Sequence, residues 1–598
     1  MLFVRKSYAF ATAILLLVTY SLFSNLPPAA ETPDIDDAEF SSPPAPNDGR
    51  IRWTKRPERH PVSSYIQLPT DEPSPIPQIQ HNFPSESWSG RRERVKRQNA
   101  VKAAFQHAWK GYKKYAWLHD ELSPLSGDNR DAFAGWAATI VDSLDSLVIM
   151  GMTDEFEKAL TALDRIDFTT TQATQINVFE TTIRYLGGFM AAYDLTNGKY
   201  PILLKKAVEV GEFLYSAFDT RNRMPQSRWE WTRTVQGSVI QPSRNTILAE
   251  LGSLNLEFTR LSQLTNDSKY FDAIQRITDN MEKAQNNTSV PGLWPVMVNA
   301  EAMEFTDPRF TVGGMADSMY EYLPKEHMLL GARTNQYRHM YASAIDAIKN
   351  LLIFRGMTKD KREVYFAGDS YTALHSKEDV EPQAEHLKCF LGGMVGIGAK
   401  IFGRSAEELR LARGLTEGCI WAYDSMPTGI MPESFYVSAC DDLNSCKWNE
   451  YKWYRDVHRR LSKGPFSENV IPEAQAIAKN YGLPPGITKI GDPKYLLRPE
   501  AIESVFIMYR ITGDKSLQDA AWRMFQSIEK ITRSKYAHAA ISDVRNVDTP
   551  QLDYMESFWL GETLKYFYLI FSEPGHISLD EYVLNTEAHP FKRPSSGS

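Results

Sequence analysis

The sequence has few cysteines and no excess of positive charge, and each shortage excludes a class of protein. Four cysteines among 598 residues cannot build the dense disulfide framework of a small secreted scaffold, although one or two bridges fit. A formal net charge of −7 provides no basic field of the kind that attracts nucleic acid. The sequence also lacks a P-loop, a dinucleotide-binding fingerprint, an HExxH motif and a nucleophile elbow. With 42% hydrophobic and 24% charged residues, the composition is that of a globular protein with ample core-forming residues.

A long apolar run lies near the N-terminus. Arg5 and Lys6 precede an uncharged stretch at residues 7–26, and roughly 20 apolar residues are enough to cross a bilayer as a helix. Basic residues before the run favour a cytoplasmic tip and a lumenal remainder, so residues 1–26 are predicted to be a signal anchor. The alternative is a signal peptide cleaved near Ala29–Ala30, which would give a secreted form. Both interpretations place the protein in the secretory pathway. Three N-x-S/T sequons agree with lumenal exposure: Asn266, Asn286 and Asn287.

A proline-rich region follows the apolar run. Residues 27–84 contain 13 prolines among polar residues, a composition that cannot bury a core and is typically extended or disordered. The sequence therefore predicts a stem at residues 27–98, an ordered domain at 99–592 and a short tail at 593–598. Within the stem, Lys96–Arg97 offers an alternative interpretation as a processing site that releases a soluble form.

Helical periodicity dominates the rest of the chain. Apolar residues recur at helical spacing from Val101 onward, and alternating strand patterns are scarce, so only short strands are expected, in loops. Three stretches share one layout, a helix that ends in a Thr-Asn or Thr-Gly turn before a second amphipathic helix, with turns at Thr196, Thr265 and Thr512. About seven such hairpins fit the ordered domain, as an open solenoid or a closed α/α barrel. The lack of obvious polar capping repeats favours an all-α closed barrel with its loops, and its site, at one end.

Acidic residues stand inside apolar helical segments, and these are the candidates for chemistry. A buried carboxylate is costly unless it is paired, hydrogen-bonded or metal-bound. Taken singly, each fits a surface ion pair, as Glu180 does with Arg184 at the favourable i, i+4 spacing. Together they indicate a shared polar cavity, and carboxylates with different pKa values suit glycoside cleavage, which needs an acid and a base. The set is Glu180, Glu250, Glu257, Asp317, Glu321, Glu500, Glu503, Glu556 and Glu562.

Seven segments, in order, resemble glycoside hydrolase family 47, the class I α-1,2-mannosidases, in their fungal and Golgi-like form. The resemblance runs from about Ala104 to Pro590. It implies an (α/α)7 barrel and inverting, Ca²⁺-dependent hydrolysis of terminal α-1,2-linked mannose from high-mannose N-glycans, Man9 toward Man5. It also implies a monomer in the Golgi or endoplasmic reticulum membrane. The segments are GWAATIVDSLDSLVIMG (135–151), VFETTIRYLGG (178–188), GGMADSMYEYL (313–323), EHLKCFLGG (385–393), LRPEAIESVF (497–506), MESFWLGETLKY (555–566) and LNTEAHP (584–590).

The resemblance assigns roles position by position. Glu180 matches the general acid, acting directly or through water, and Glu500 matches the general base that activates the attacking water. Asp317 matches a third essential carboxylate. Thr586 matches the Ca²⁺ ligand, through its hydroxyl and its backbone carbonyl, which suits a hard cation that prefers oxygen. Substrate-binding positions are matched by Arg184, Glu250, Met315, His386, Arg498, Glu503, Phe558, Glu562 and Glu587.

The four cysteines bear on disulfide pairing, and one departure from the family pattern bears on branch selection. Cys389 and Cys419 match the disulfide of the family, whereas Cys440 and Cys446 either pair or stay free. Family members of the endoplasmic reticulum that remove a single mannose carry an arginine two residues before the aspartate, where this chain has Met315. An apolar side chain in place of a hydrogen-bonding fork predicts looser branch selection. The segment Ser438–Pro485 departs from the pattern and receives no role.

Two other interpretations belong to different classes of protein. The first is a mannose-binding quality-control protein that resembles the family and recognises glycoproteins without trimming them. Such relatives usually lack the cysteine pair, which is present here at Cys389 and Cys419. The second is an open helical scaffold without a pocket.

Overall fold

Helices in two layers form the framework of the described part of the chain. The structure is a computed structural model and describes residues 49–371, 379–404, 406–462 and 470–594. The predicted anchor at residues 7–26 lies outside these ranges. Within them, no helix combines the length and the apolar character needed to cross a membrane.

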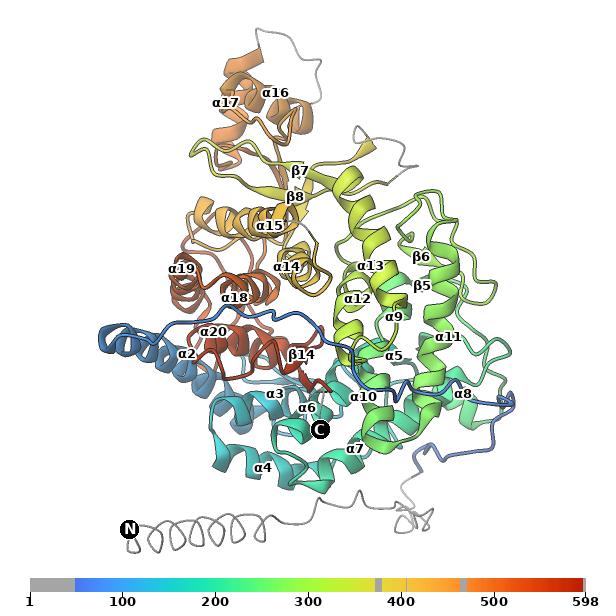
Figure 1. The fold of residues 1–598 in the computed structure, drawn as a ribbon. Helices are drawn as coiled ribbons and strands as arrows, with labels where there is room; N and C mark the ends of the chain where they lie inside the picture. Colours follow the sequence, from blue (N-terminus) through green and yellow to red (C-terminus); the bar gives the residue numbers. More distant parts are fainter. Residues whose placement is uncertain (1–48, 372–378, 405, 463–469, 595–598) are drawn as a thin grey trace, which may run out of the picture. The chain divides into compact units, whose positions relative to one another are not determined.

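The inner layer is a closed ring of helices (Figure 1). Each inner helix contacts the next along the chain, and the π-helical turn η7 (Trp559–Thr563), which leads into the last inner helix, contacts the first and closes the ring. The closed barrel is therefore confirmed, and the open solenoid is excluded. The ring consists of α3 (Ala138–Ile149), α6 (Gly187–Leu195), α10 (Asn255–Thr265), α12 (Asp317–Leu329), α14 (Leu391–Ile401), α18 (Glu500–Thr512) and α20 (Leu564–Ile570).

An outer layer of amphipathic helices covers the ring. In α11, for example, Tyr270, Ile274, Ile277 and Met281 recur at helical spacing and are buried against the inner layer. In the order of their inner partners α3 to α20, the outer helices are α4 (Thr153–Leu163), α7 (Pro201–Tyr215), α11 (Ser268–Gln285), α13 (Gln336–Ala347), α15 (Ala406–Ser425), α19 (Lys515–Thr532) and α2 (Trp88–Tyr115).

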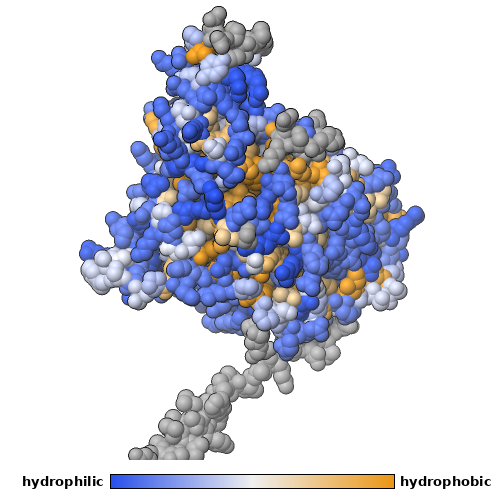
Figure 2. Space-filling view, turned by 45° about the horizontal axis from the view of Figure 1, so that its top comes forward, coloured by the Kyte–Doolittle hydropathy of each residue, from blue (hydrophilic) through white to orange (hydrophobic). Residues whose placement is uncertain are grey.

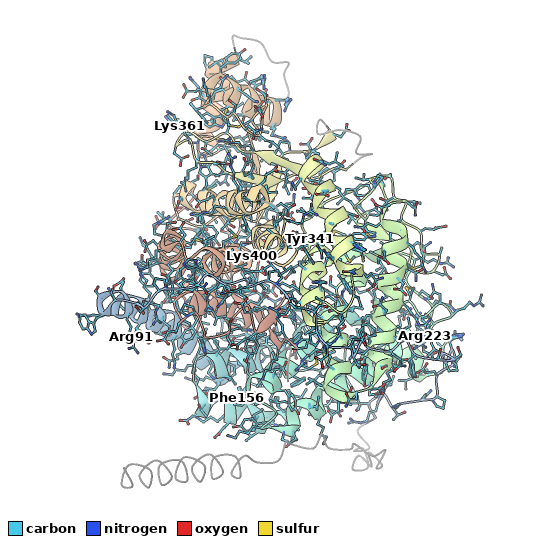
Figure 3. The ribbon with its side chains drawn as sticks, viewed as in Figure 1. Arg91, Phe156, Arg223, Tyr341, Lys361 and Lys400 are labelled. Carbon is cyan, nitrogen blue, oxygen red and sulfur yellow. A yellow bond between two sulfur atoms is a disulfide. The ribbon has the colours of Figure 1, made fainter. Side chains whose placement is uncertain are left out.

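Small residues let the two layers approach closely at α14. A Cβ atom on Gly398 would lie 2.1 Å from the hydroxyl of Tyr341 on α13, a distance that no real contact allows. Figure 3 labels Tyr341 and Lys400 in this region. A side chain at position 398 would therefore require the ring of Tyr341 or its helix to move.

The hairpins give the barrel two different ends. Because a short turn joins each inner helix from α3 to α18 to the next outer helix, the C-termini of the inner helices gather at one end, here called the turn end. At this end Thr196, Thr265 and Thr512 each donate a side-chain hydrogen bond to the carbonyl four residues earlier, at 2.8, 2.8 and 2.7 Å. This shared bond explains the sequence repeat. The N-termini of the inner helices lie at the other end, the open end.

Short strands and small helices occupy the loops between the hairpins, as the sequence predicts. All strand pairs are antiparallel: β1 (Glu121–Leu122) with β2 (Asn129–Arg130), β3 (Ile176–Asn177) with β4 (Arg228–Trp229), β5 (Thr246–Ile247) with β6 (Met297–Val298), β7 (Ile353–Arg355) with β8 (Tyr365–Ala367), and β12 (Ala540–Ile541) with β13 (Gln551–Leu552). One sheet has three strands, β9 (Gln383–Glu385), β10 (Ser434–Val437) and β11 (Ile487–Asp492).

Between β10 and β11 the chain leaves the barrel. This part carries α16 (Glu450–Leu461) and α17 (Ile471–Asn480), the orange pair at the top of Figure 1. The remaining helical turns are α5 (Val178–Thr181), η1 (Thr182–Leu186), η2 (Ser216–Phe218), α8 (Trp231–Val235), α9 (Leu248–Gly252), η3 (Ile348–Leu352) and η5 (Leu387–Phe390).

A C-terminal hairpin fills the barrel from the turn end. Its strands are β14 (Tyr582–Leu584) and β15 (Pro590–Lys592), and they contact α12 and α6. The base of the hairpin lies beside the turn after α12, where Pro594 approaches Gly331. Its tip is fixed inside the barrel because buried His589 bonds Asp145 at 2.9 Å. We call residues 582–592 the plug.

The segment before α2 corrects the predicted stem. Residues 51–87 have no helix or strand, yet the compact unit begins at Ile51 and the side chain of Ile79 is fully buried. This segment is the blue chain that crosses the barrel in Figure 1, and we call it the strap. Proline lacks an N–H, but several of the other backbone N–H groups of the strap donate to the barrel.

The strap is bound mainly across the turn end. Backbone N–H groups donate to the barrel at Ile66 to Asp272 (2.8 Å), Ser74 to Gly331 (2.9 Å), Ile79 to Asp580 (2.6 Å) and His81 to Arg510 (2.7 Å). Ser87 then caps α2, so the ordered domain begins well before residue 99. The Lys96–Arg97 pair lies within α2, and a helix interior is a poor site for proteolysis compared with a loop. Arg91, labelled in Figure 3, lies on the projecting start of this helix.

Candidate active site

A cavity of about 320 Å³ lies at the open end, between the N-termini of the inner helices and the tip of the plug. All the positions to which the resemblance assigns a catalytic, substrate-binding or metal-binding role line this cavity, except His386. Of the other acidic candidates, Glu321 lines it, whereas Glu257 and Glu556 do not. Asp317 and Glu500 reach it as the first residues of the inner helices α12 and α18. The other carboxylates reach it from the same two helices, from short helical turns at the open end and from the plug. The predicted residues on its wall are Glu180, Arg184, Glu250, Met315, Asp317, Arg498, Glu500, Glu503, Phe558, Glu562, Thr586 and Glu587.

Glu180 is held by its own helix start and by an arginine. The side chain of Asn177 accepts hydrogen bonds from the backbone N–H groups of Phe179 and Glu180, at 3.1 and 3.3 Å, and so caps α5. Arg184, four residues later in the π-helical turn η1, approaches Oε2 of Glu180 with Nε at 3.0 Å and Nη2 at 2.9 Å. It also donates to Glu587 of the plug at 3.0 Å. Arg184 therefore connects Glu180 to the plug.

Asp317 is the first residue of α12, and its surroundings favour the protonated form. Oδ1 accepts a hydrogen bond from the N–H of Ser318 at 2.9 Å. Burial, together with the negative charges of Glu385 and Glu321, nevertheless raises the pKa of Asp317 to about 8. At neutral pH this side chain therefore holds a proton that it can donate.

Glu500 is the first residue of α18, and its surroundings have the opposite effect. Although burial raises its pKa, the hydrogen bond and charge of His386, with the charge of Arg498, lower the pKa of Glu500 below its ordinary value. His386 Nδ1 lies 2.7 Å from Oε2 of Glu500, and its Nε2 lies 2.9 Å from the hydroxyl of Tyr423. His386 is fully buried, so it supports Glu500 from behind and does not reach the cavity.

More carboxylates surround the tip of the plug. Lys325 on α12 bonds Glu321 and approaches Glu503 at 3.5 Å. Burial nevertheless raises the pKa of Glu503 to about 8 and that of Glu587 to about 7. Burial and the neighbouring Glu587 also raise the pKa of Glu562. The cavity floor thus has more acidic groups than the nearby cations neutralise.

Thr586 stands at the tip of the plug, among these carboxylates. Its N–H donates to the hydroxyl of Tyr322 at 3.2 Å, whereas its own hydroxyl and carbonyl make no hydrogen bond within the described ranges. In the part of the chain that the structure describes, no three Asp, Glu, His or Cys side chains are placed so that they could hold a metal ion together. A cation here would therefore take the two oxygens of Thr586 and complete its shell with water. Oxygen donors beside a group of carboxyls fit a hard cation.

The remaining predicted residues form the walls and the mouth. Arg228 donates a hydrogen bond to Glu250, and burial raises the pKa of Glu250. Arg498 donates to Glu433 at 2.5 Å and lies 3.8 Å from Glu500. Arg228 also lines the cavity. It lies outside the seven motif segments, so the sequence gives no sign of its role.

Phe558 and Met315 contribute apolar surface. Phe558 is nearly buried and lines the cavity, where its ring offers an apolar contact for a sugar. Met315 is 40% exposed and has a left-handed φ of 79°, which is unusual for a residue with a side chain. Its carbonyl accepts a hydrogen bond from the N–H of Ala249 at 3.0 Å, which holds this conformation.

Both cysteine pairs are joined. Cys389 of η5 and Cys419 of α15 form a disulfide with a Cα–Cα distance of 6.1 Å. It closes a sequence separation of 30 residues, for which a stabilisation of about 3 kcal/mol is typical. Cys440 and Cys446 form the second disulfide, which settles the alternative left open by the sequence.

Comparisons with known proteins agree with this geometry. The model of glycosyl hydrolase family 47 matches residues 104–593. The endoplasmic reticulum mannosyl-oligosaccharide 1,2-alpha-mannosidase of Homo sapiens is 35% identical over 83% of this chain, and the match spans 64% of that relative's own length. The mannosyl-oligosaccharide alpha-1,2-mannosidase of Coccidioides posadasii is 34% identical over 87% of this chain and 96% of that relative. The solved alpha-1,2-mannosidase from Trichoderma reesei superposes with a TM-score of 0.71 at 30% identity, over 84% of this chain and 99% of that structure.

Proposed function

We propose, since the chain belongs to glycosyl hydrolase family 47, that it is a glycosidase that removes terminal α-1,2-linked mannose from high-mannose N-glycans. One observation carries the proposal. The cavity joins Glu500, whose pKa is lowered, with Asp317, whose pKa is raised to about 8. Two carboxyl groups with separated pKa values in one sugar-sized cavity are what acid–base cleavage of a glycosidic bond requires.

The proposed reaction begins with Glu500 as the base. Because its pKa is low, Glu500 stays ionised at neutral pH and can take a proton from a water molecule as that water attacks the anomeric carbon. His386 and Tyr423 hold the carboxylate in position from behind. Arg498 limits its movement on the cavity side.

The leaving oxygen needs a proton from the other side of the bond. Glu180, at the start of α5, is the proposed donor, directly or through water, and Arg184 fixes its orientation. Asp317 holds a proton at neutral pH and can supply that water chain. We propose inversion at the anomeric carbon, because one carboxylate activates water while another donates a proton. Proton NMR of the first product formed distinguishes inversion, which releases β-mannose, from retention.

A calcium ion is part of the proposal. Thr586 would hold it through its hydroxyl and carbonyl oxygens, and the acidic residues around the plug tip would offset its charge. When bound, such an ion orients sugar hydroxyls and polarises them. A chelator should then abolish activity, and added Ca²⁺ should restore it. Activity that persists in excess chelator would contradict this part.

We also propose that the chain trims several mannoses. Met315 places an exposed apolar side chain at the cavity mouth, so this position provides no charged fork that would fix one branch. The expected course is Man9 toward Man5, within the secretory pathway. The membrane anchor at residues 7–26 remains a prediction from the apolar run.

Incubating the chain with Man9 and Ca²⁺ tests the proposal directly. Release of mannose that is lost in Glu500→Gln supports the enzyme. Binding of Man9 without any release would favour the mannose-binding protein instead.

A further inference from the structure

The catalytic cavity is small for the proposed substrate. Its volume of about 320 Å³ lies at the low end of the range for small-molecule pockets, about 300–1,000 Å³. A glycan with nine mannoses therefore has to lie mostly outside the cavity, on the loops at the open end. The described surface that borders the mouth must then contact the distal sugars.

One face of the β9–β10–β11 sheet leads outward from the cavity. Antiparallel pairing puts Glu385 opposite Ser434, and Gln383 opposite Tyr436, so these four side chains share a face. Ala384 and Phe435 point the other way and are buried. Glu385 marks the inner end of the shared face, because it accepts a hydrogen bond at 2.6 Å from the N–H of Gly314, which lines the cavity.

The outer end of the face carries aromatic rings and hydrogen-bond donors. Tyr436 pairs with Lys489 of β11 as well as with Gln383, which adds a cationic donor to the same face. The ammonium of Lys489 lies 5.3 Å from the ring of Tyr436 and forms no ion pair within the described ranges. Tyr371 is 54% exposed, and its hydroxyl lies 3.1 Å from Oε1 of Gln383, which holds an open ring in place.

Arg460 supports this surface. It belongs to Ser438–Pro485, the segment that received no role from the sequence. Arg460 comes from α16, within 438–485, and its guanidinium lies over the ring of Tyr436 at 4.2 Å. Arg460 also pairs with Glu381 at 2.9 Å, which fixes it against the sheet. The segment therefore positions Tyr436.

We propose that this face, made of Tyr371, Gln383, Tyr436 and Lys489, is a second binding surface for the distal mannoses of the glycan whose terminal sugar occupies the cavity. The inference rests on the proposed function. The strand rise of about 3.3 Å per residue puts Gln383 and Tyr436 roughly 7 Å beyond Glu385, about one sugar from the cavity. Tyr371 is exposed and Tyr436 is half-buried. Rings with neighbouring donors suit sugars, whose faces are apolar and whose edges carry hydroxyls. The surface of the projecting α16–α17 region is largely hydrophilic in Figure 2, which argues against an apolar protein partner there.

The test compares a large and a small substrate. The full chain, Tyr371→Ala and Lys489→Ala are assayed for kcat/KM on Man9 and on α-1,2-mannobiose, which fills only the cavity. We expect each variant to lower the ratio of the two values about three- to tenfold, and the double variant to lower it further. Tyr451→Ala is the matched control, because Tyr451 is an exposed tyrosine of α16 outside this face.

The outcomes separate the two proposals. An unchanged ratio in both variants, or a ratio that falls equally in Tyr451→Ala, would overturn the second surface. If the wild-type chain cleaves neither substrate, the proposed function fails. Calorimetric binding of Man9 by the wild type and by Lys489→Ala then tests the surface, and equal affinities would overturn it.

Discussion

The two ends of the barrel are built from the same helices, yet they carry different chemistry. At the open end the first turns of the inner helices contribute Asp317 and Glu500 to one cavity. At the turn end the last residues of those helices form tight turns, covered by the strap and by the base of the plug. Function is therefore concentrated where the loops are long, and stability where they are short.

A single helix shows the difference most clearly. Burial raises the pKa of Asp317, at the start of α12, to about 8, and it also raises the pKa of Glu326, nine residues later, to about 8. Asp317 lines the cavity, whereas Glu326 accepts a hydrogen bond from Thr259 at 2.6 Å and has no access to substrate. The same physical effect keeps a proton on a cavity residue at one end and costs stability near the other.

The largest expected effect is on catalysis at the open end. Glu500→Gln removes the group that accepts the proton of water, so kcat should fall about 100- to 10,000-fold. The melting temperature should stay within a degree or two, because the amide can still bond His386. Assays with Man9 and thermal melts measure both. A large loss of stability would mean that Glu500 is structural, and that the two ends are less distinct.

Removing the strap tests the turn end. A chain that begins at Trp88 loses the buried side chain of Ile79 and the hydrogen bonds to Gly331 and Asp580. Its free energy of unfolding should be at least about 2 kcal/mol lower than that of a chain that begins at Ile51, since burying one large aliphatic side chain is worth about 1.5–3 kcal/mol. Below its melting temperature it should keep its kcat. Equal free energies of unfolding for the two chains would show that the strap does not stabilise the barrel.

The pH dependence of stability separates Glu326 from Asp317. Because the folded-state pKa of Glu326 is raised to about 8, its contribution to stability is full below the unfolded value near 4 and is lost as pH rises to about 8. Glu326→Gln never ionises. This variant should therefore melt above the wild type at pH 8, and the difference should shrink toward pH 5.

The activity of Glu326→Gln provides the control. Its alkaline decline in kcat/KM should match that of the wild type, because Asp317 still loses its proton near pH 8. A shifted pH profile of kcat/KM would mean that the ionisation of Glu326 affects the groups in the cavity.

The smallest expected effect concerns the order in which the trimmed products appear. Met315→Arg places a charged fork at the cavity mouth, so one Man8 isomer should accumulate before slower trimming, while hydrolysis of mannobiose stays within about threefold. Chromatography of timed Man9 digests shows this. If the wild-type chain itself accumulates one Man8 isomer, the account of Met315 is wrong.

Much of the open end could be predicted from the sequence, because its residues lie in local motifs at helix starts. Glu180, Asp317 and Glu500 each stand in an apolar helical segment, where a carboxylate is unexpected. The supporting position of His386 could not be predicted, since only the fold brings it behind Glu500. Arg228 was missed for the same reason.

The turn end was harder to predict, because its contacts join distant parts of the chain. The composition of residues 51–87 indicates a stem, and only the partners at Asp272, Gly331 and Asp580 make it a strap. Likewise Lys325, Glu326 and His327 form a charged run typical of a solvent-facing helix. All three are buried because α12 belongs to the inner ring, which the outer helices and the plug cover.

A timed digest of Man9 by the chain with Ca²⁺, followed by mass spectrometry and proton NMR, tests the central claim most directly. The account predicts stepwise loss of four mannoses to Man5, with β-mannose as the first product, and no loss in Glu500→Gln. Intact Man9 after incubation with the wild-type chain, or equal digestion by Glu500→Gln, would contradict it.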